Sequence, residues 1–206
     1  SLHLGRHDKS HLPAGDQPLL DLCAAPGGKT ARLAAARPGA APLVAADAKA
    51  ARVRLLKTAA KKIEARPVPV VLVDGTAPPF RAGSFGAVLV DGPCSGTGVL
   101  RHHPEGRWLL DAATPGRNGV VLLELARQAC GLLRPGGQLL YATCSLEPEE
   151  NERVVGDLLH TVPALEPAPD DQGRWQRRWL PGQAPGDGFY AARLRRKDDE
   201  PGEDRS

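Results

Sequence analysis

The chain has 206 residues, of which 41% are hydrophobic, so it can bury the core of one globular α/β domain and is not a disordered chain. Its formal net charge of +3 is too small to indicate nucleic-acid binding by itself. No apolar run reaches the roughly 18 residues of a membrane helix, and no signal-peptide pattern opens the chain. We therefore expect neither a membrane protein nor a secreted one.

The four cysteines are Cys23, Cys94, Cys130 and Cys144, and no two of them have C-x-x-C spacing. This pattern argues against a zinc site and against a disulfide framework, and it favours a reducing compartment, the cytoplasm. We expect no bound metal. The sequence contains no methionine, which suggests a processed protein or a piece of a longer one.

Strands and helices alternate along the first half of the chain. Apolar, β-branched runs predict strands at 19–23, 43–46, 68–73 and 85–90. Periodic apolar positions predict helices at 30–36 and 48–65. The segment 92–107, rich in glycine and polar residues, is predicted to be a long functional loop.

The second half continues the alternation. It predicts a helix at 117–133, a strand at 138–143, a helix that begins at Pro148, and a last strand at 189–194. Residues 163–187 predict an extended connector with a short strand near 175–179. The whole pattern is typical of an α/β fold with a doubly wound, mostly parallel sheet, which binds ligands outside the carboxyl ends of its strands.

Chemically useful side chains occupy just those strand ends. Cys23, Asp47, Asp74, Asp91 and Cys144 all fall at or just beyond the end of a predicted strand. Core residues would not all fall at the same edge of a sheet. We therefore expect a ligand and reaction site there.

The first three strand ends predict a cofactor that contains adenosine. Gly27 and Gly28 allow the backbone to approach a ligand, and the helix that follows presents its positive end. Asp47 is placed to accept from ribose hydroxyls, and Asp74 from the exocyclic amine of a purine. Taken singly, the glycines also fit an ordinary tight turn, and each aspartate also fits a helix N-cap.

Lys29-Thr30 raises a competing interpretation, a phosphate-binding loop. The pattern G-x-x-x-x-G-K-[ST] requires glycine at position 23, where this chain has Cys23. An ATPase is therefore the less favoured alternative.

The remaining strand ends predict covalent chemistry on a pyrimidine. A thiolate that adds to carbon 6 of cytosine makes carbon 5 nucleophilic, a carboxyl group stabilises the developing charge, and a base then removes the proton from carbon 5. Cys144, Asp91 and Cys94 fit these roles, although the residues alone do not decide which cysteine attacks. Cys130, in a leucine-rich helix, is predicted to be a small buried core residue.

These motifs resemble a known family. LDLCAAPGGKT (20–30), DGPCSGTG (91–98), and ATCS (142–145) followed by PEENE (148–152) look like the RNA cytosine-5 methyltransferases of the NOL1/NOP2/Sun group. Within that group, RHHP with RW between 101 and 108, and LPG with GDGFYAARL between 180 and 194, resemble the bacterial enzymes that act on small-subunit ribosomal RNA.

The resemblance implies a seven-stranded Rossmann-like sheet, the cofactor S-adenosyl-L-methionine, and formation of 5-methylcytosine in 16S ribosomal RNA. It implies that Cys144 is the nucleophile and Cys94 the base for product release. We also expect a monomer. The implied cofactor-binding residues are Cys23, Ala24, Ala25, Pro26, Gly27, Gly28, Lys29, Asp47, Asp74 and Asp91.

The same resemblance suggests three parts of the chain. Residues 1–18 are expected to be a lead-in, the remnant of an upstream RNA-binding region. Residues 19–197 are expected to form the catalytic domain, and residues 198–206 an acidic tail.

A cluster of basic residues precedes that tail, and it either contacts phosphates or is an ordinary solvated surface. The alternative function is an RNA-binding module of the same fold without catalysis. The basic cluster consists of Arg174, Arg177, Arg178, Arg193, Arg195, Arg196 and Lys197.

Overall fold

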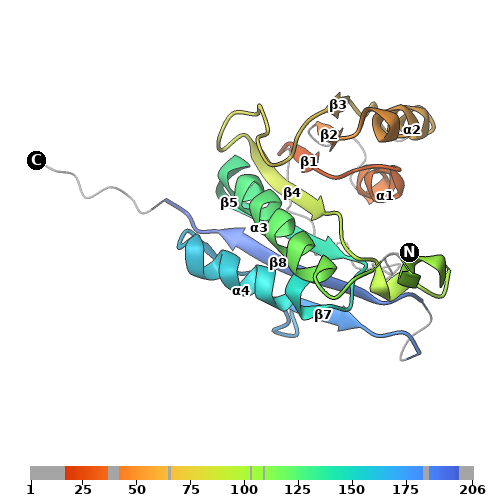
Figure 1. Ribbon diagram of the computed structural model, residues 1–206. Coiled ribbons are helices and arrows are strands. Elements are labelled where there is room, and N and C mark those ends of the chain that lie inside the picture. Colours follow the sequence, from red (N-terminus) through yellow and green to blue (C-terminus); the bar gives the residue numbers. More distant parts are fainter. Residues whose placement is uncertain are drawn as a thin grey trace, which may run out of the picture.

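The computed structural model describes residues 17–36, 42–64, 66–102, 104–108, 110–182 and 186–199. Within these residues, eight strands form one sheet in the order β3-β2-β1-β4-β5-β8-β6, and β7 pairs with β8 beside that path (Figure 1). The strands are β1 (Leu19–Asp21), β2 (Leu43–Asp47), β3 (Val70–Leu72), β4 (Phe85–Asp91), β5 (Leu133–Thr143), β6 (Leu165–Pro167), β7 (Gln176–Trp179) and β8 (Phe189–Arg196). The helices are α1 (Gly28–Ala36), α2 (Ala50–Ala60), α3 (Thr114–Leu132) and α4 (Glu152–Thr161), with 3-10 turns η2 (Thr97–Val99), η3 (Pro104–Trp108) and η4 (Pro148–Glu150).

The strands β1 to β5 are parallel and end at one edge of the sheet. Leu20 of β1 lies opposite Val44 of β2 and Val88 of β4, and Asp91 of β4 lies opposite Ala142 of β5. β8 is antiparallel to β5, β6 and β7. This register brings the segments that follow β1, β2, β4 and β5 to the same end of the molecule, as the sequence predicts.

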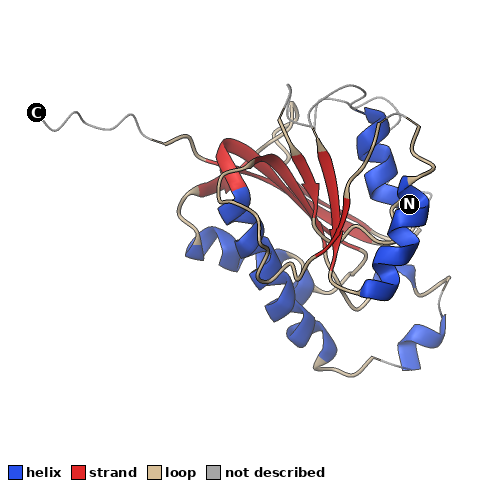
Figure 2. Ribbon diagram, turned by 90° about the horizontal axis from the view of Figure 1, so that it is seen from above, coloured by secondary structure: helices blue, strands red, loops and turns tan. Residues whose placement is uncertain are grey.

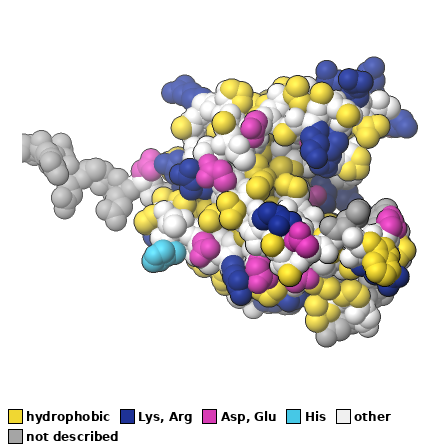
Figure 3. Space-filling model, viewed as in Figure 1, with side chains coloured by type: hydrophobic (Ala, Val, Ile, Leu, Met, Phe, Trp, Pro, Cys, Tyr) yellow, Lys and Arg dark blue, Asp and Glu magenta, His cyan; other side chains and the backbone are white. Residues whose placement is uncertain are grey.

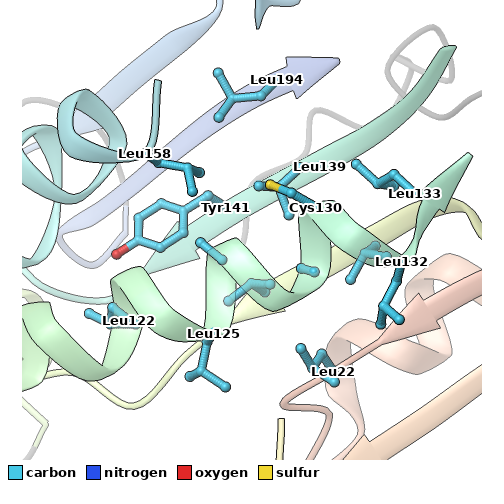
Figure 4. Close-up of a cluster of buried hydrophobic side chains, with 14 of the residues drawn as sticks. Leu22, Leu122, Leu125, Cys130, Leu132, Leu133, Leu139, Tyr141, Leu158 and Leu194 are labelled. Carbon is cyan, nitrogen blue, oxygen red and sulfur yellow. The ribbon is translucent and has the colours of Figure 1, made fainter. Parts of the chain in front are cut away.

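Helices cover both faces of the sheet (Figure 2). On one face, α3 and α4 pack against the central strands, with side chains such as Leu122, Tyr141 and Leu158 buried between them (Figure 4). On the other face, Leu33 of α1 packs on β1, β2 and β4, and Leu56 of α2 packs on β2. The predicted doubly wound α/β fold is confirmed. Among the described helices, none combines the length and apolar character needed to cross a membrane.

The strand count differs from the prediction of seven. β6 lies inside the segment that was expected to be a connector, and it pairs with the end of β8. Its three residues are too few to produce an alternating pattern in the sequence. β5 begins at Leu133 rather than at residue 138, because Leu133 already pairs with Phe85 and the intervening turn with Gly136 is accommodated as a bulge.

Three helix boundaries also differ. α2 ends at Ala60, where the prediction extended to residue 65, because bonds of the i→i+3 type close the chain into a turn before Pro67. α3 begins at Thr114, three residues early, with a proline in its first turn. The helix predicted from Pro148 is instead η4, interrupted at Asn151 (φ −121°, ψ −100°) before α4 starts.

Candidate active site

Two cysteines meet at the carboxyl ends of β4 and β5. Because these strands are parallel neighbours, the segments that follow them leave the sheet side by side. The Sγ atoms of Cys94 and Cys144 lie 3.4 Å apart, and both side chains are partly buried. The structure therefore brings together the two thiols that the sequence predicts at one site.

The surroundings of the two sulfurs are unequal. The pKa of Cys144 is lowered, chiefly because the thiol of Cys94 donates a hydrogen bond to it, and Lys29 adds to this effect while burial and Asp91 oppose it. The pKa of Cys94 is raised by that same hydrogen bond, by burial and by the nearby carboxyl of Glu150. Cys144 is thus the sulfur that more readily becomes a thiolate, the form that attacks carbon.

The other two thiols both have raised pKa values. Burial raises the pKa of Cys130, which is a residue of α3 that faces the core, to about 12. Burial likewise raises the pKa of Cys23, at the turn after β1, to about 12. Neither is poised as a nucleophile, which agrees with the prediction that Cys130 is a core residue.

Close backbone contacts hold the cysteine segments together. Gly98 N donates to Cys144 O (2.9 Å), and Gly188 N donates to Gly98 O (2.8 Å). A Cβ atom at Gly98 would lie 2.3 Å from Gly188 O and 2.8 Å from Cys144 O, so only glycine fits there. The segments after β4, after β5 and before β8 therefore form one packed unit.

A buried carboxyl group fixes the Cys94 segment. Glu150, with 0% exposure, accepts hydrogen bonds from Ser95 N (2.7 Å), Ser95 Oγ (2.6 Å) and Asn118 Nδ2 (2.7 Å). The hydroxyl of Tyr141 donates to its main-chain oxygen. Glu150 thus joins the Cys94 segment to α3 and β5.

The next residue does the same for the Cys144 segment. Asn151, also fully buried, accepts from Thr143 Oγ1 (2.6 Å) and donates through Nδ2 to Ser145 O (3.0 Å). Both contacts flank Cys144 directly. In the sequence, Glu150 and Asn151 stand out only as part of the motif PEENE, which predicts no role for either residue. The sequence feature that could have indicated a role is that these two polar residues closely follow a predicted strand that leads into a cysteine.

We expect Glu150→Ala to lower the free energy of unfolding by about 3 kcal/mol, because three buried donors lose their acceptor. Glu150→Gln is the matched control: it keeps one acceptor oxygen, and the hydroxyl of Ser95 can rotate to accept from the new amide. Its loss should stay within about 1 kcal/mol. Urea unfolding of the unaltered protein and of the two variants measures both losses in the free energy of unfolding. Equal stability of the alanine and glutamine variants would contradict this account.

Asp47 at the end of β2 supports the turn after β1. Its carboxyl accepts from Ala25 N (3.3 Å) and from Lys49 N (3.0 Å), and Arg52 Nε lies 3.5 Å from Oδ2. Arg52 also donates to Ala25 O (2.5 Å). Asp47 is only 3% exposed, so it forms the floor of the turn rather than a surface group.

The turn itself requires glycine at one position. Gly27 has φ +109°, and a Cβ atom there would lie 3.0 Å from Ala59 Cβ and 3.2 Å from Leu56 Cδ1. Gly28, the first residue of α1, has open space where a Cβ atom would be. The backbone is therefore open to a ligand at the positive end of α1.

Lys29 and Asp91 connect this turn to the cysteines. Their side chains form a close ion pair and are about one-quarter exposed (26% and 24%). Burial raises the pKa of Asp91, and the charge of Lys29 opposes that rise. Since Lys29 is engaged by a carboxyl group, it does not resemble the lysine of a phosphate-binding loop.

Asp74 differs from its neighbours at this edge. It is exposed, and its carboxyl accepts from Thr76 N (2.9 Å) and Thr76 Oγ1 (2.7 Å), which lowers its pKa. It lies just beyond the end of β3, as the sequence predicts, but it is held in a local turn.

Asp21, the last residue of β1, was not among the predicted site residues. It is fully buried, and its Oδ2 accepts from Thr30 Oγ1 (2.6 Å). Its Oδ1 has no hydrogen-bond partner among the described residues. Burial raises its pKa to about 7. The strand prediction continued to Cys23 and so treated this carboxyl group as part of a strand interior.

This raised pKa predicts how stability depends on pH. As pH rises from about 4 to about 7, the unfolded chain releases the Asp21 proton while the folded chain retains it. Stability should therefore fall over this window, by up to about 1.4 kcal/mol per pH unit, and level off above it. Asp21→Asn should remove this component. Urea unfolding of the unaltered protein and of Asp21→Asn between pH 5 and 8 measures the difference. If the free energies of unfolding of the two proteins change with pH in parallel, the pKa assigned to Asp21 is wrong.

Comparisons with known proteins identify the family of the chain. The family model described as 16S rRNA methyltransferase RsmB/F matches residues 11–195. The ribosomal RNA small subunit methyltransferase B of Cronobacter sakazakii is 37% identical over 190 residues, which cover 90% of this chain and 43% of that protein. The chain thus spans less than half the length of this curated relative.

Solved structures share the fold. The crystal structure of PH0851 superposes with a TM-score of 0.82 and 31% identity, covering 88% of this chain and 43% of that one. NSun6 from Pyrococcus horikoshii, crystallised with SFG, has a TM-score of 0.76 and 26% identity over 91% of this chain and 50% of its own. From the matched residues and the shared fold, the chain belongs to the RsmB/F family of 16S rRNA methyltransferases, which are S-adenosylmethionine-dependent enzymes.

Proposed function

We propose that this chain is the catalytic domain of an enzyme that forms 5-methylcytosine in 16S ribosomal RNA. The observation that carries the proposal is the 3.4 Å contact between the sulfurs of Cys94 and Cys144, with the Asp91–Lys29 pair acting electrostatically on Cys144. Two thiols of opposite pKa shift and one carboxyl group are the set that methylation of cytosine at carbon 5 requires. Family membership supplies the RNA substrate.

The residues after β1 and β2 suit S-adenosylmethionine. The backbone is open at Gly28, and the buried carboxyl of Asp47 and the partly buried carboxyl of Asp91 offer acceptors for ribose hydroxyls and negative charge for a sulfonium group. The unpartnered Oδ1 of Asp21 adds a further buried acceptor near them. When bound, the cofactor supplies an electrophilic methyl group. We assign its binding to residues 23–29, Asp47, Asp74 and Asp91.

Cys144 starts the reaction as a thiolate. Its sulfur forms a bond to carbon 6 of cytosine, and the electron pair of the 5,6 double bond moves toward carbon 5 and the ring. Asp91, whose pKa burial raises, can hold a hydrogen bond to the ring nitrogen that gains electron density. Carbon 5 is then able to take the methyl group.

Cys94 completes the reaction. Once the sulfur of Cys144 is bonded to carbon 6, it is a weaker acceptor, and the hydrogen bond that raises the pKa of Cys94 is lost. Cys94 can then release its proton to solvent and remove the one on carbon 5. The electron pair left on carbon 5 rebuilds the double bond and expels the sulfur of Cys144 as a thiolate.

Nucleoside mass spectrometry tests the proposal. The full-length protein is incubated with unmodified 16S ribosomal RNA and S-adenosylmethionine that carries a labelled methyl group. The expected product is labelled 5-methylcytidine at one site. Label on another base or atom contradicts the proposal, and RNA binding without any label favours an RNA-binding module without catalysis.

A further inference from the structure

The basic cluster near the end of the chain is mostly neutralised. In the lower half of the face seen in Figure 3, basic and acidic side chains adjoin one another, whereas basic side chains gather at the upper right, over α2. Arg177 of β7 is exposed, and it forms no ion pair with a carboxyl group among the described residues. Ion pairs join Arg174 to Asp170, Arg178 to Glu152, Arg195 to Glu166 and Asp198, and Arg196 to Asp199.

Arg177 is the outer end of a row of neighbouring aromatic and basic side chains. Its guanidinium carbon lies 4.9 Å from the centroid of the Trp179 ring. The Trp179 and Phe189 centroids are 6.1 Å apart. Lys29 Nζ lies 5.5 Å from the Phe189 centroid and pairs with Asp91. The row therefore runs from the exposed Arg177 to the ion pair of Lys29 with Asp91, the last residue of β4.

Strand pairing explains why the row reaches the site. β7 pairs with the first half of β8, where Trp179 lies opposite Phe189 and Arg177 opposite Ala191. That half of β8 lies beside the carboxyl end of β5, with Thr143 opposite Tyr190. β7 thus extends the sheet at the same end as Cys144 (Figure 1).

We propose that Arg177 and Trp179 bind a nucleotide of single-stranded RNA next to the target cytosine, with the indole stacking on its base and the guanidinium holding its phosphate. Every base has a π-face that an aromatic ring can stack against. A guanidinium that lies over a ring keeps its in-plane N–H groups for phosphate oxygens. This inference rests on the proposed function, because an RNA substrate must occupy the cysteine site for its neighbour to reach β7.

The test measures binding of a fluorescent seven-nucleotide RNA with one central cytosine to the full chain, by anisotropy. We expect Trp179→Ala to weaken binding about tenfold, the scale of one lost stacked base, and Trp179→Phe by about twofold. Arg177→Ala should lower the slope of log affinity against log salt by about 0.7, as for one lost phosphate contact. Arg54→Ala, a matched exposed arginine on α2, should change nothing.

A second RNA identifies the base that stacks. When the nucleotides that flank the cytosine are abasic, the tenfold effect of Trp179→Ala should disappear, because there is no base left to stack. Thermal protection by S-adenosylmethionine should be equal in all variants, which shows that they are folded. Since Arg177 is exposed, its variant stays informative if Trp179→Ala does not fold.

The outcomes separate the two proposals. If the unaltered protein methylates RNA and neither Trp179→Ala nor Arg177→Ala weakens RNA binding, the stacking site on β7 is wrong and the proposed function stands. An effect of Trp179→Ala that persists with abasic RNA also overturns the stacking site. If the unaltered protein neither binds RNA nor methylates it, both proposals fail.

Discussion

Replacing Cys144 with alanine should abolish methyl transfer to RNA, with a fall in rate of about 10⁴-fold or more, the scale of losing a covalent nucleophile. The reason is that carbon 5 of cytosine has no nucleophilic character until sulfur adds to carbon 6. We propose Cys144 as the thiol that performs this addition, since its pKa is lowered. Transfer of a labelled methyl group to RNA measures the rate.

Cys130→Ala is the matched control for this loss. It also removes one thiol, but from the core, where burial raises the pKa to about 12. A modest loss of stability with full methyl transfer is the expected result. Methyl transfer by Cys144→Ala at the rate of the unaltered protein would show that another group attacks the base.

Replacing Cys94 with alanine should cause a covalent protein–RNA complex to accumulate during the reaction, whereas replacing Cys144 should prevent the complex from forming. The methylated adduct would keep its proton on carbon 5, because the base 3.4 Å from the attacking sulfur is gone. The complex should migrate as a shifted band under denaturing conditions. Protease treatment should return RNA that carries a peptide containing Cys144.

The same substitution should also slow adduct formation at neutral pH. The thiol of Cys94 is the main group that lowers the pKa of Cys144, so its removal raises that pKa and leaves less thiolate. Raising the pH should then restore the rate of adduct formation. The double variant, with both cysteines replaced, should form no adduct. An adduct that accumulates with Cys144→Ala instead of Cys94→Ala would mean that the two roles are exchanged.

The site residues on β2, β4 and β5 could be predicted because a local pattern placed them. An apolar run followed by Asp47, Asp91 or Cys144 marks a strand end, and parallel strands bring such ends to one edge. Asp74 lies just beyond the end of β3, as predicted, but only the structure shows that its carboxyl accepts hydrogen bonds from Thr76.

Residues that act across long sequence separations could not be predicted. Glu150 contacts Ser95 from 55 residues away, and its burial depends on how α3 and η4 pack. Asp21 looks like an ordinary strand residue until the helix α1 covers it. Nothing in the order of residues reveals whether a polar side chain will be enclosed.

The amino-acid sequence alone determined the alternation of strands and helices, the edge of the sheet where the chemistry lies, and the set of thiols and carboxyls found there, because periodicity and strand ends are local properties. Only the tertiary structure decided that Cys94 and Cys144 touch, in which direction the pKa of each thiol is shifted, and that Arg177 has no carboxyl partner among the described residues. Those properties depend on distances between segments and on burial, and burial sets both the pKa of a thiol and the cost of an unpaired charge.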